Sequence, residues 1–482
     1  MRKTPLSLSI MLIGLGAAVV SGGAMASGYH FGTQSVSSQG TANASGVEAN
    51  DATVIFSNPA GLSHVKGTTA SAVLDIVIPE ASFTDKGSRT LLGKPTGGGD
   101  GGKFASTTAV PHFFLSHQIS DKVTFGLGTF VPFGSHTKYD DNWVGRYNVK
   151  ETDLKTLAIN PSVAFKLTDS ITLGGGVTAQ YIEGKLTKSA DFGSGAVAAL
   201  ARAGQISAAQ AAALTPVMSG NPTYDGSVVV KGDDWGYGYN LGLMFELDAG
   251  TRFGIAYRSA IKHELAGTAD WTVPQSLATS PLGAAGALVL ADLNGRYVDS
   301  GASLNIDTPE SFSISAYKQI GDKAALMADI TRTRHSRFKE LRIDFHSTLA
   351  DSNTPENWSD TTKVSFGGTY RLSDALLLRA GISYDRSPVT DQNRTPSIPD
   401  NDRKWFSLGG NWAINKDSSL DFAYSFVKLN KSTINTFDNG GVTDKDGKPT
   451  CDSTRNTSSC ATIVGEYDVK SSIIGIQYNY RF

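Results

Sequence analysis

The sequence predicts an all-β membrane protein: a 14-stranded antiparallel transmembrane β-barrel with an N-terminal hatch, or plug, inside its lumen. Three observations predict it. Apolar and small or polar residues alternate along most of the chain after residue 66, which is the period of a β-strand. Tight turn signals and long polar segments alternate between these strands. The segment that precedes them is too polar and too rich in Gly and Ser to bury a core of its own.

The composition supports this class and excludes others. The chain has 482 residues with 52 glycines and 16 tyrosines, and 40% of its residues are hydrophobic. No run of about 18 apolar residues follows the N-terminus, which excludes a bundle of transmembrane helices. The net charge of −2 indicates neither a nucleic acid nor an anionic surface as partner.

Residues 1–26 have the pattern of a cleaved signal peptide. Arg2 and Lys3 form a positive start, an apolar stretch follows from Leu6 to Val20, and Ala24-Met25-Ala26 is an A-x-A cleavage site. We therefore expect a mature protein that begins at Ser27 and is exported to the bacterial outer membrane. The alternative is a retained membrane anchor, and the intact mass of the mature protein distinguishes the two.

Residues 27–66 form the predicted hatch. Here Val54-Ile55-Phe56 runs directly into Asn58-Pro59-Ala60-Gly61-Leu62. Pro59 fixes its own φ and biases Asn58 toward an extended conformation. Such a segment needs a container, and residues 67–482 are predicted to be that container. For Asn58, Pro59 and Ala60 two roles stay open: a gating element, or a turn that joins the plug to the wall.

The last strand shows the two-faced pattern most clearly. One face carries Ile474, Ile476, Tyr478, Tyr480 and Phe482, and the other carries Gly475, Gln477, Asn479 and Arg481. The same pattern recurs at 252–258, 363–370, 376–383 and 420–426. A soluble antiparallel sheet could show it too. Alternating tyrosines before a terminal phenylalanine favour an outer-membrane barrel, in which the apolar face meets lipid and the tyrosines join an interfacial girdle.

The connections between strands set the strand count. Six tight turns are predicted, at residues 120–122, 168–170, 248–250, 321–323, 373–375 and 415–417. Seven long polar segments alternate with them, at about 81–103, 134–151, 190–224, 274–300, 347–356, 388–402 and 431–462. This is the asymmetry of short periplasmic turns and long external loops. It gives fourteen strands and leaves both chain ends on the periplasmic side.

The external loop at 190–224 is expected to carry its own helices. Its Ala-rich stretch Gly195–Met218 is interrupted by Gly204 and stopped by Pro216, which predicts two short helices. They would be either a surface that catches a lipid-like substrate or an inert lid.

The two cysteines, Cys451 and Cys460, lie in another external loop. We expect a disulfide that staples this loop, worth roughly 2–3 kcal/mol in the chain-entropy model. A metal site is disfavoured because no histidine or further cysteine lies nearby. No spacing along the chain matches a zinc site or a nucleophile elbow, so neither a metal, a cofactor nor an enzymatic activity is predicted.

Several motifs in this order resemble the long-chain fatty acid transporter (FadL) family of outer-membrane proteins, which includes aromatic-hydrocarbon uptake channels. The motifs are Asn58-Pro59-Ala60, the Gly-rich strand with Gln180-Tyr181, Thr308-Pro309-Glu310, the run from Ile398 to Arg403 with Trp405, and the aromatic C-terminus. Trp405 and Arg403 themselves are expected to mark a strand start and an interfacial anchor.

The resemblance implies a mechanism. A hydrophobic ligand passes from the external face into an apolar pocket and leaves sideways, through an opening in the wall, into the bilayer. The resemblance also places an aromatic residue near the mature N-terminus at the pocket; Tyr29 matches it, with Phe31 close by. The wall opening is to be looked for at strand glycines, bulges or prolines such as Pro132 and Pro161.

A fatty acid carboxylate needs a basic or amide partner. Arg258, Lys363 and Arg379 fall on the predicted lumen face and are the candidates. Alternatively, these cations pair across the lumen with Asp329, Asp385 or Asp421.

The predicted function is therefore outer-membrane transport of hydrophobic compounds, and long-chain fatty acids are the first candidate cargo. The partners are the hydrophobic small molecule and outer-membrane lipid, with no nucleic acid, and a monomer is expected. The alternatives are uptake of other hydrophobics such as aromatic hydrocarbons, a general diffusion porin, an outer-membrane hydrolase, and a purely structural barrel.

Overall fold

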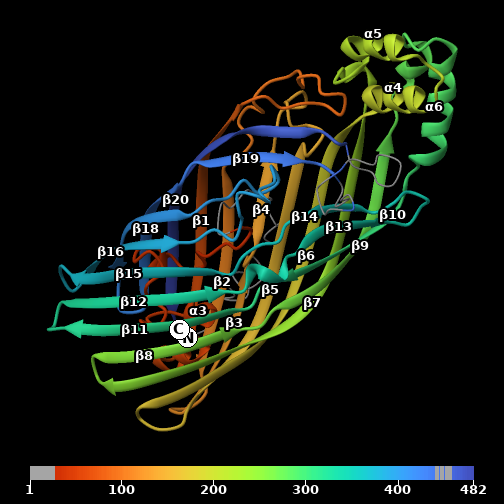
Figure 1. Ribbon diagram of the computed structural model, residues 1–482. Coiled ribbons are helices and arrows are strands. Elements are labelled where there is room, and N and C mark those ends of the chain that lie inside the picture. Colours follow the sequence, from red (N-terminus) through yellow and green to blue (C-terminus); the bar gives the residue numbers. More distant parts are fainter. Residues whose placement is uncertain (1–27, 440–444, 446–449, 451–458) are drawn as a thin grey trace, which may run out of the picture.

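The computed structural model describes residues 28–439, 445, 450 and 459–482, which form a closed antiparallel β-barrel (Figure 1). The predicted signal peptide and Ser27 lie outside the described residues, as does Cys451. Cys460 is part of a disulfide, and its predicted pairing with Cys451 stays a prediction.

Fourteen barrel strands make up the wall. Eight are continuous: β1 Thr68–Asp85, β2 Thr108–Gln118, β5 Glu151–Lys166, β6 Ile171–Asp191, β7 Asp225–Asp248, β16 Leu376–Asp385, β17 Arg403–Ala413 and β20 Thr462–Arg481. The other six consist of two segments each: β3 Val123–Phe130 with β4 Gly134–Lys138, β8 Thr251–Arg258 with β9 Ile261–Thr272, β10 Ser300–Thr308 with β11 Ser311–Ile320, β12 Ala324–Thr333 with β13 Glu340–Phe345, β14 Ser352–Pro355 with β15 Thr361–Arg371, and β18 Ser418–Leu429 with β19 Ser432–Phe437.

The barrel closes because β1 pairs with both β2 and β20. Each of the six predicted tight turns lies between consecutive strands, so the predicted strand count is confirmed. The predicted loops were too long in four places, where β1, β4, β14 and β19 extend into them. These extensions are polar, and polar residues can pair in a ladder above the membrane without the apolar alternation that marks a lipid-facing strand.

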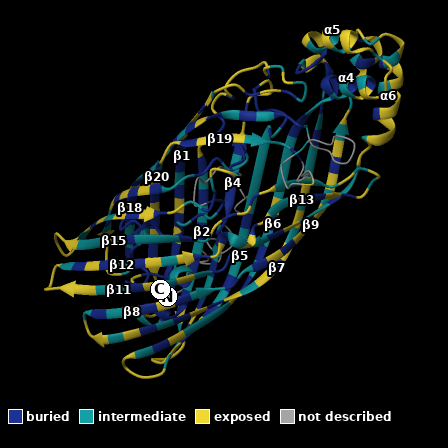
Figure 2. Ribbon diagram, viewed as in Figure 1, coloured by how far each residue is buried: buried dark blue, intermediate teal, exposed yellow. Residues whose placement is uncertain are grey.

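The apolar face of the wall points outward, as predicted. In β20, Ile476 is 51% exposed whereas its neighbour Gln477 is 0% exposed. Figure 2 shows the same alternation of exposed and buried positions along other strands. Exposed aromatic residues lie on this outer face, among them Tyr237, Trp412, Tyr478 and Phe482. An outward apolar face with aromatic residues is the surface of a lipid-embedded barrel.

Helices gather at the end of the barrel opposite the tight turns (Figure 1). The two predicted helices are present as α4 Phe192–Arg202 and α5 Ala208–Met218. The prediction that Pro216 stops the second was wrong, because α5 continues to Met218. The 274–300 loop adds η3 Gln275–Thr279 and the unpredicted α6 Ala284–Arg296, and η2 Pro222–Tyr224 leads into β7. Among the described residues, no helix is long and apolar enough to cross a membrane.

The N-terminal segment, residues 28–66, lies against the inner faces of the strands. It contains α2 Val36–Gln39, α3 Val54–Ser57 and η1 Pro59–His64, and a further short helix, η4 His335–Arg337, sits between β12 and β13. Most side chains of the segment are buried although it has little apolar surface; Val36, Ala42 and Ile55 are each 0% exposed. Its polar groups must therefore find partners in the wall.

Candidate functional site

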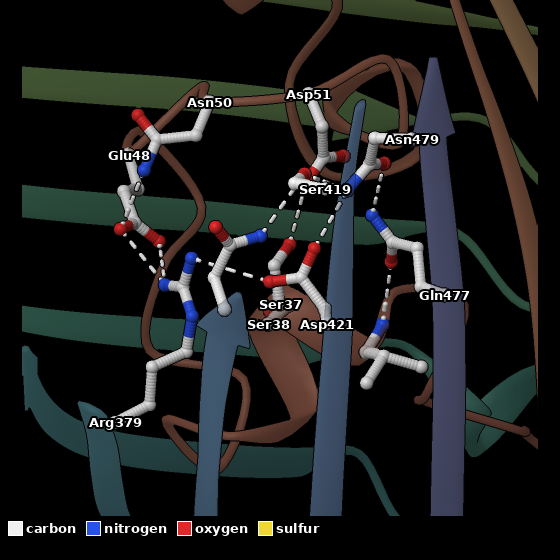
Figure 3. A network of polar contacts seen from close by, with 12 residues as sticks. Ser37, Ser38, Glu48, Asn50, Asp51, Arg379, Ser419, Asp421, Gln477 and Asn479 are labelled. Carbon is white, nitrogen blue, oxygen red and sulfur yellow. Dashed lines mark hydrogen bonds and ion pairs between the residues drawn. The ribbon is translucent and has the colours of Figure 1, made fainter. Parts of the chain in front are cut away.

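A buried ion pair joins the N-terminal segment to the wall. Arg379 of β16 donates to Glu48 at 2.6 and 2.8 Å, and its guanidinium lies 3.7 Å from Asp421 of β18 (Figure 3). Both Arg379 and Glu48 are at most 5% exposed. The charge is thus neutralised inside the protein, which a buried arginine requires.

A second set of polar contacts holds helix α2 (Figure 3). The Val36 backbone N–H donates to Gln477 at 2.9 Å, and the Gln39 amide donates to the Ile473 carbonyl at 3.0 Å, both on β20. Asn479 in turn donates to Asp421 at 2.7 Å. The last strand therefore binds the segment through Gln477, a side chain that the sequence pattern had assigned to the lumen, and through the Ile473 carbonyl.

The Asn58-Pro59-Ala60 motif sits in a notch formed by strand glycines. Asn58 donates to the Leu243 carbonyl of β7 at 3.1 Å and accepts from Ala60 N–H at 3.0 Å. A Cβ atom on Gly174 would collide with the Pro59 and Ala60 backbone, and one on Gly242 would collide with Asn58. Glycine is thus needed where the motif touches the wall. This docking fits the plug-to-wall turn as well as a gate, so both roles stay open.

The wall is interrupted where the start of the segment meets it. β2 pairs with β3 only from Phe113 to Gln118, and β4 pairs with β5. Residues 131–133 separate β3 from β4. Across this break, the His112 ring of β2 accepts from Val131 N–H at 3.3 Å. Pro132, one of the two prolines named in advance, lies in this break.

The N-terminal segment pairs with the interrupted stretch. Phe31 N–H donates to the Pro132 carbonyl at 2.8 Å, and Gly134 N–H donates to the Tyr29 carbonyl at 2.8 Å. Between them His30 forms an antiparallel bridge with Phe133. The segment therefore supplies part of the backbone hydrogen bonding that neighbouring wall strands do not provide at this point.

An apolar cavity lies beside this contact. Its volume is about 820 Å³, including the space at its open mouth, and Tyr29 is one of the residues that line it. The Tyr29 hydroxyl donates to the Asp307 carbonyl at 3.0 Å, and its ring packs on Trp358, 5.2 Å between centroids. Other lining residues include Leu154, Val230, Leu265, Leu304, Ile306, Phe338, Ile343, Glu356 and Ile398. A concave apolar site with few polar groups is the usual form of a hydrophobic ligand site.

A second, polar cavity lies on the other side of residues 29–32. It measures about 1480 Å³ by the same count and is lined by His30, Gly32, Arg258 and Lys363 among others. Burial lowers the pKa of His30 to about 3, so its ring is neutral. The first residues of the segment therefore separate a polar space from an apolar one, with Tyr29 on one side and His30 on the other.

The three candidate cations have different surroundings. Arg379 is the most strongly paired, because it contacts Asp421, one of the three carboxylates named in the lumen-pairing alternative, and also Glu48, which that alternative did not include. Arg258 donates to the Phe56 carbonyl at 3.0 Å and packs over the Phe56 ring. The Lys363 ammonium lies 4.8 Å from the centre of the Trp405 ring, and no ion pair within 4.0 Å joins it to a described residue. Neither Arg258 nor Lys363 is thus held by a carboxylate as Arg379 is, although Asp329 and Asp385 line the same cavity.

Two expectations about aromatic residues need revision. Phe31 lines neither cavity; it is 2% exposed and stacks on the His112 ring. Trp405 is not an interfacial anchor, because β17 turns it into the lumen at 2% exposure and turns Phe406 outward at 52%. Arg403 does begin β17, as predicted, and is hydrogen-bonded to Asp400 and Asp385.

Sequence reasoning missed much of the apolar cavity and its neighbours. Phe338, Trp358 and Glu356 lie in connections between strand segments, where no periodicity marks a buried residue. A Glu-x-Trp pair in an otherwise polar loop is the one available signal. Among the described residues there is no group of His, Cys, Asp and Glu side chains that could hold a metal ion.

A closed barrel with an apolar outer face defines an integral outer-membrane protein. The family model of outer membrane protein transport proteins (OMPP1/FadL/TodX) matches residues 17–482. The chain belongs to this family and is an outer-membrane transport protein.

Relatives match over nearly their whole length. An outer membrane protein of Neisseria meningitidis serogroup B, whose name specifies no substrate, is 36% identical over 487 residues, covering 99% of this chain and 100% of the relative. The long-chain fatty acid transport protein of Salmonella typhi is 30% identical over 440 residues, covering 90% and 94%. The crystal structure of a Pseudomonas aeruginosa FadL homologue has a TM-score of 0.79 at 24% identity, covering 94% and 100%, which supports the fold.

Proposed function

We propose that this protein carries long-chain fatty acids, or hydrophobic compounds of similar shape, across the outer membrane. Cargo is captured at the external face and binds with its chain in the apolar cavity. It then leaves sideways into the bilayer through the break between β2 and β4. Residues 27–66 act as the hatch that controls this release. The fatty acid assignment follows the Salmonella typhi relative.

One observation carries the proposal: the N-terminal segment is paired to the wall at its break, next to the apolar cavity. Tyr29 belongs to both, because its carbonyl accepts from Gly134 while its ring lines the cavity. A ligand that moves Tyr29 would therefore disturb the contact that fills the break. This is a two-state element of the kind that ligand binding can bias.

The energetics favour such a device. Burial of each CH₂ group is worth about 0.8 kcal/mol, so an apolar cavity captures long chains where a water-filled pore cannot. Tight capture alone would stop transport. Release requires the site to change shape, and displacement of residues 29–31 would both open the break and remove one wall of the cavity.

The carboxylate of a fatty acid would face the polar cavity. Lys363 and Arg258 line that cavity, and neither forms an ion pair within 4.0 Å with a described residue, although Asp329 and Asp385 line the cavity too. The chain would extend past Tyr29 into the apolar cavity. The external helices α4, α5 and α6 pack around a shared apolar cluster and are the proposed catching surface.

Aromatic hydrocarbons are the second candidate cargo. The rings of Tyr29 and Phe338 line the apolar cavity, and Trp358 packs on both of them. Aromatic rings offer a flat ligand favourable stacking or edge contacts. The buried N-terminal segment argues against a general diffusion porin.

A reversible lock tests the hatch. His30 and Phe133 face each other between the two backbone hydrogen bonds, which is the close, non-hydrogen-bonded type of pair that a disulfide can bridge. We expect the His30→Cys/Phe133→Cys double variant to lose uptake of a labelled fatty acid when oxidised and to regain it on reduction. Each single variant, treated in the same way, is the control. Uptake that is equal in the oxidised and reduced double variant would contradict the proposal.

A further inference from the structure

Residues 131–133, which form the break between β3 and β4, lie outside the regular strand pairing. Backbone groups in a wall that faces lipid need hydrogen-bond partners from elsewhere in the protein. The N-terminal segment supplies two of these partners. The Gln34 side-chain amide donates to the Val131 carbonyl at 2.9 Å, and Phe31 N–H donates to the Pro132 carbonyl at 2.8 Å. The segment thus holds the carbonyl groups of the first two residues of the break.

The wall supplies the remaining partners through two side chains. Thr156 of β5 accepts from Phe133 N–H at 3.0 Å and donates to the Phe133 carbonyl at 2.6 Å. His112 of β2 accepts from Val131 N–H at 3.3 Å through its Nδ1 atom. Pro132 has no N–H group, so every backbone N–H and carbonyl of the break has a partner. Thr156 is on the strand that pairs with β4, whereas His112 is on the opposite side of the opening.

The bond between His112 and Val131 crosses the opening from one wall strand to the other. Regular pairing of β2 with β3 ends at Phe113, directly after His112. The other described hydrogen bonds across the opening lie further along, where residues 104–106 meet β4. Between these two closures, His112 is the one described side chain of β2 that is hydrogen-bonded to the opposite edge.

The imidazole ring of His112 is held in one orientation. A backbone N–H can only donate, so Nδ1 carries no proton, and the ring is neutral with its proton on Nε2. Nε2 faces Asp75 Oδ2 of β1 at 3.5 Å, and both side chains are fully buried. The Phe31 ring stacks on the imidazole with 6.0 Å between the ring centroids. The ring therefore contacts the wall and the N-terminal segment at once.

We propose that His112 is a latch of the wall itself: its bond to Val131 keeps the opening shut and must break each time cargo leaves. Displacement of the N-terminal segment frees the carbonyl groups of Val131 and Pro132, but it leaves this bond in place. Release then needs two separate events, movement of the segment and release of the latch. The inference rests on the proposed function, in which this break is the exit, and it adds a wall residue that controls release.

The test compares two polar replacements that reach different atoms of the ring. In His112→Asn the side-chain oxygen can lie where Nδ1 lies, so the bond to Val131 is kept. In His112→Gln the longer side chain places its polar atoms near the position of Nε2, so the bond is lost. His112→Leu removes both positions. His117→Leu is the control, because His117 is on the same strand but is exposed and contacts Thr68.

Two rates are measured on the full-length protein in lipid nanodiscs. The first is hydrogen exchange at the Val131 amide, which water can reach from the polar cavity that Pro132 and Phe133 line. The second is the departure of a bound fluorescent fatty acid to an excess of lipid vesicles. We expect both rates to rise about fivefold in His112→Gln and His112→Leu, the effect of losing one hydrogen bond between neutral groups. His112→Asn and His117→Leu should match wild type in both rates.

Release of the fatty acid at the wild-type rate by His112→Gln, still folded by its heat-modifiable gel band, would overturn the latch. Release by His112→Asn as fast as by His112→Gln would overturn it too. Failure of the proposed function gives a different result, because uptake is then equal in the oxidised and reduced His30→Cys/Phe133→Cys variant. An effective disulfide lock together with wild-type release in His112→Gln would overturn the latch alone.

Discussion

Arg379 and Glu48 meet at 2.6 Å inside the barrel although 331 residues separate them in the chain. The pair ties the N-terminal segment to β16, and Asp421 shares the arginine. Its members are far too buried to act as surface charges. The contact therefore makes the position of the N-terminal segment depend on the wall.

Removal of one partner of this pair should loosen the segment. Loss of one member of a buried ion pair typically costs about 3–5 kcal/mol because the other charge stays buried. We expect Arg379→Met to expose the N-terminal segment to limited proteolysis while the barrel keeps its heat-modifiable band. The Arg379→Met/Glu48→Gln double variant should recover part of the protection. As a control, Arg342→Met breaks a pair with Glu340 in which the arginine side chain is 48% exposed, and it should change little. Equal protease resistance of Arg379→Met and wild type would contradict the role.

The glycine notch under the Asn58-Pro59-Ala60 motif gives a sharper test, because two adjacent residues differ in what they touch. A Cβ atom on Gly174 would collide with Ala60, whereas one on Gly175 would make ordinary contact with Leu241 at 3.5 Å. Gly174→Ala should destabilise docking of the segment by about 1–3 kcal/mol, the usual cost of overpacking, and should reduce fatty acid uptake. Gly175→Ala should match wild type in both assays. Equal behaviour of the two variants would show that the notch does not position the motif.

Tyr29 should contribute to ligand affinity through its ring rather than its hydroxyl. Full burial of a large apolar side chain is worth about 1.5–3 kcal/mol, so Tyr29→Ala should weaken binding of a long-chain ligand by roughly tenfold or more. Tyr29→Phe keeps the ring and loses only the bond to the Asp307 carbonyl. Its affinity should stay within a few-fold of wild type. Titration with a fluorescent fatty acid measures both, and an unaltered affinity in Tyr29→Ala would remove Tyr29 from the site.

These residues show which parts of the structure the sequence could predict. Alternation fixed the lipid-facing side of each strand, as at Ile476 and Gln477, because the period of a strand leaves no choice of face once one side must meet lipid. The turns followed from local Asp, Ser, Asn and Gly signals. The polar upper ends of β1, β4, β14 and β19 could not be predicted, because above the membrane neither face has to be apolar.

The site was predictable only where a motif or a resemblance pointed to it. Tyr29 and Lys363 do line cavities. The partner of Arg379 was expected on the wall, where Asp421 lies, but the nearest carboxylate is Glu48 of the N-terminal segment. Long-range pairing inside a lumen has no periodicity to reveal it. The same holds for Glu356 and Trp358, which reach the cavity from an irregular connection.

Lys363 should matter for charged cargo alone. A hydrogen bond to a charged group is worth about 1.5–3 kcal/mol, so Lys363→Met should weaken dodecanoate binding by about tenfold or more and leave dodecanol unchanged. Lys404→Met, at the exposed position directly before Trp405, is the control. An equal loss of affinity for both probes would mean that Lys363 supports the fold of the cavity. An unchanged affinity for dodecanoate would mean that the carboxylate of the bound ligand lies elsewhere.

Glu356 should also make stability depend on pH. Its pKa in the folded protein is raised from 4.5 to about 8, so between these values the unfolded chain has released a proton that the folded protein still holds. Stability then falls as pH rises through this window, by at most about 1.4 kcal/mol for each pH unit, and levels off above about pH 8. Glu356→Gln lacks this contribution. The temperature at which the heat-modifiable band is lost should therefore drop less from pH 5 to pH 9 in Glu356→Gln than in wild type, whereas Glu340→Gln should follow wild type. Parallel curves for Glu356→Gln and wild type would show that Glu356 ionises in the folded protein as readily as in the unfolded chain.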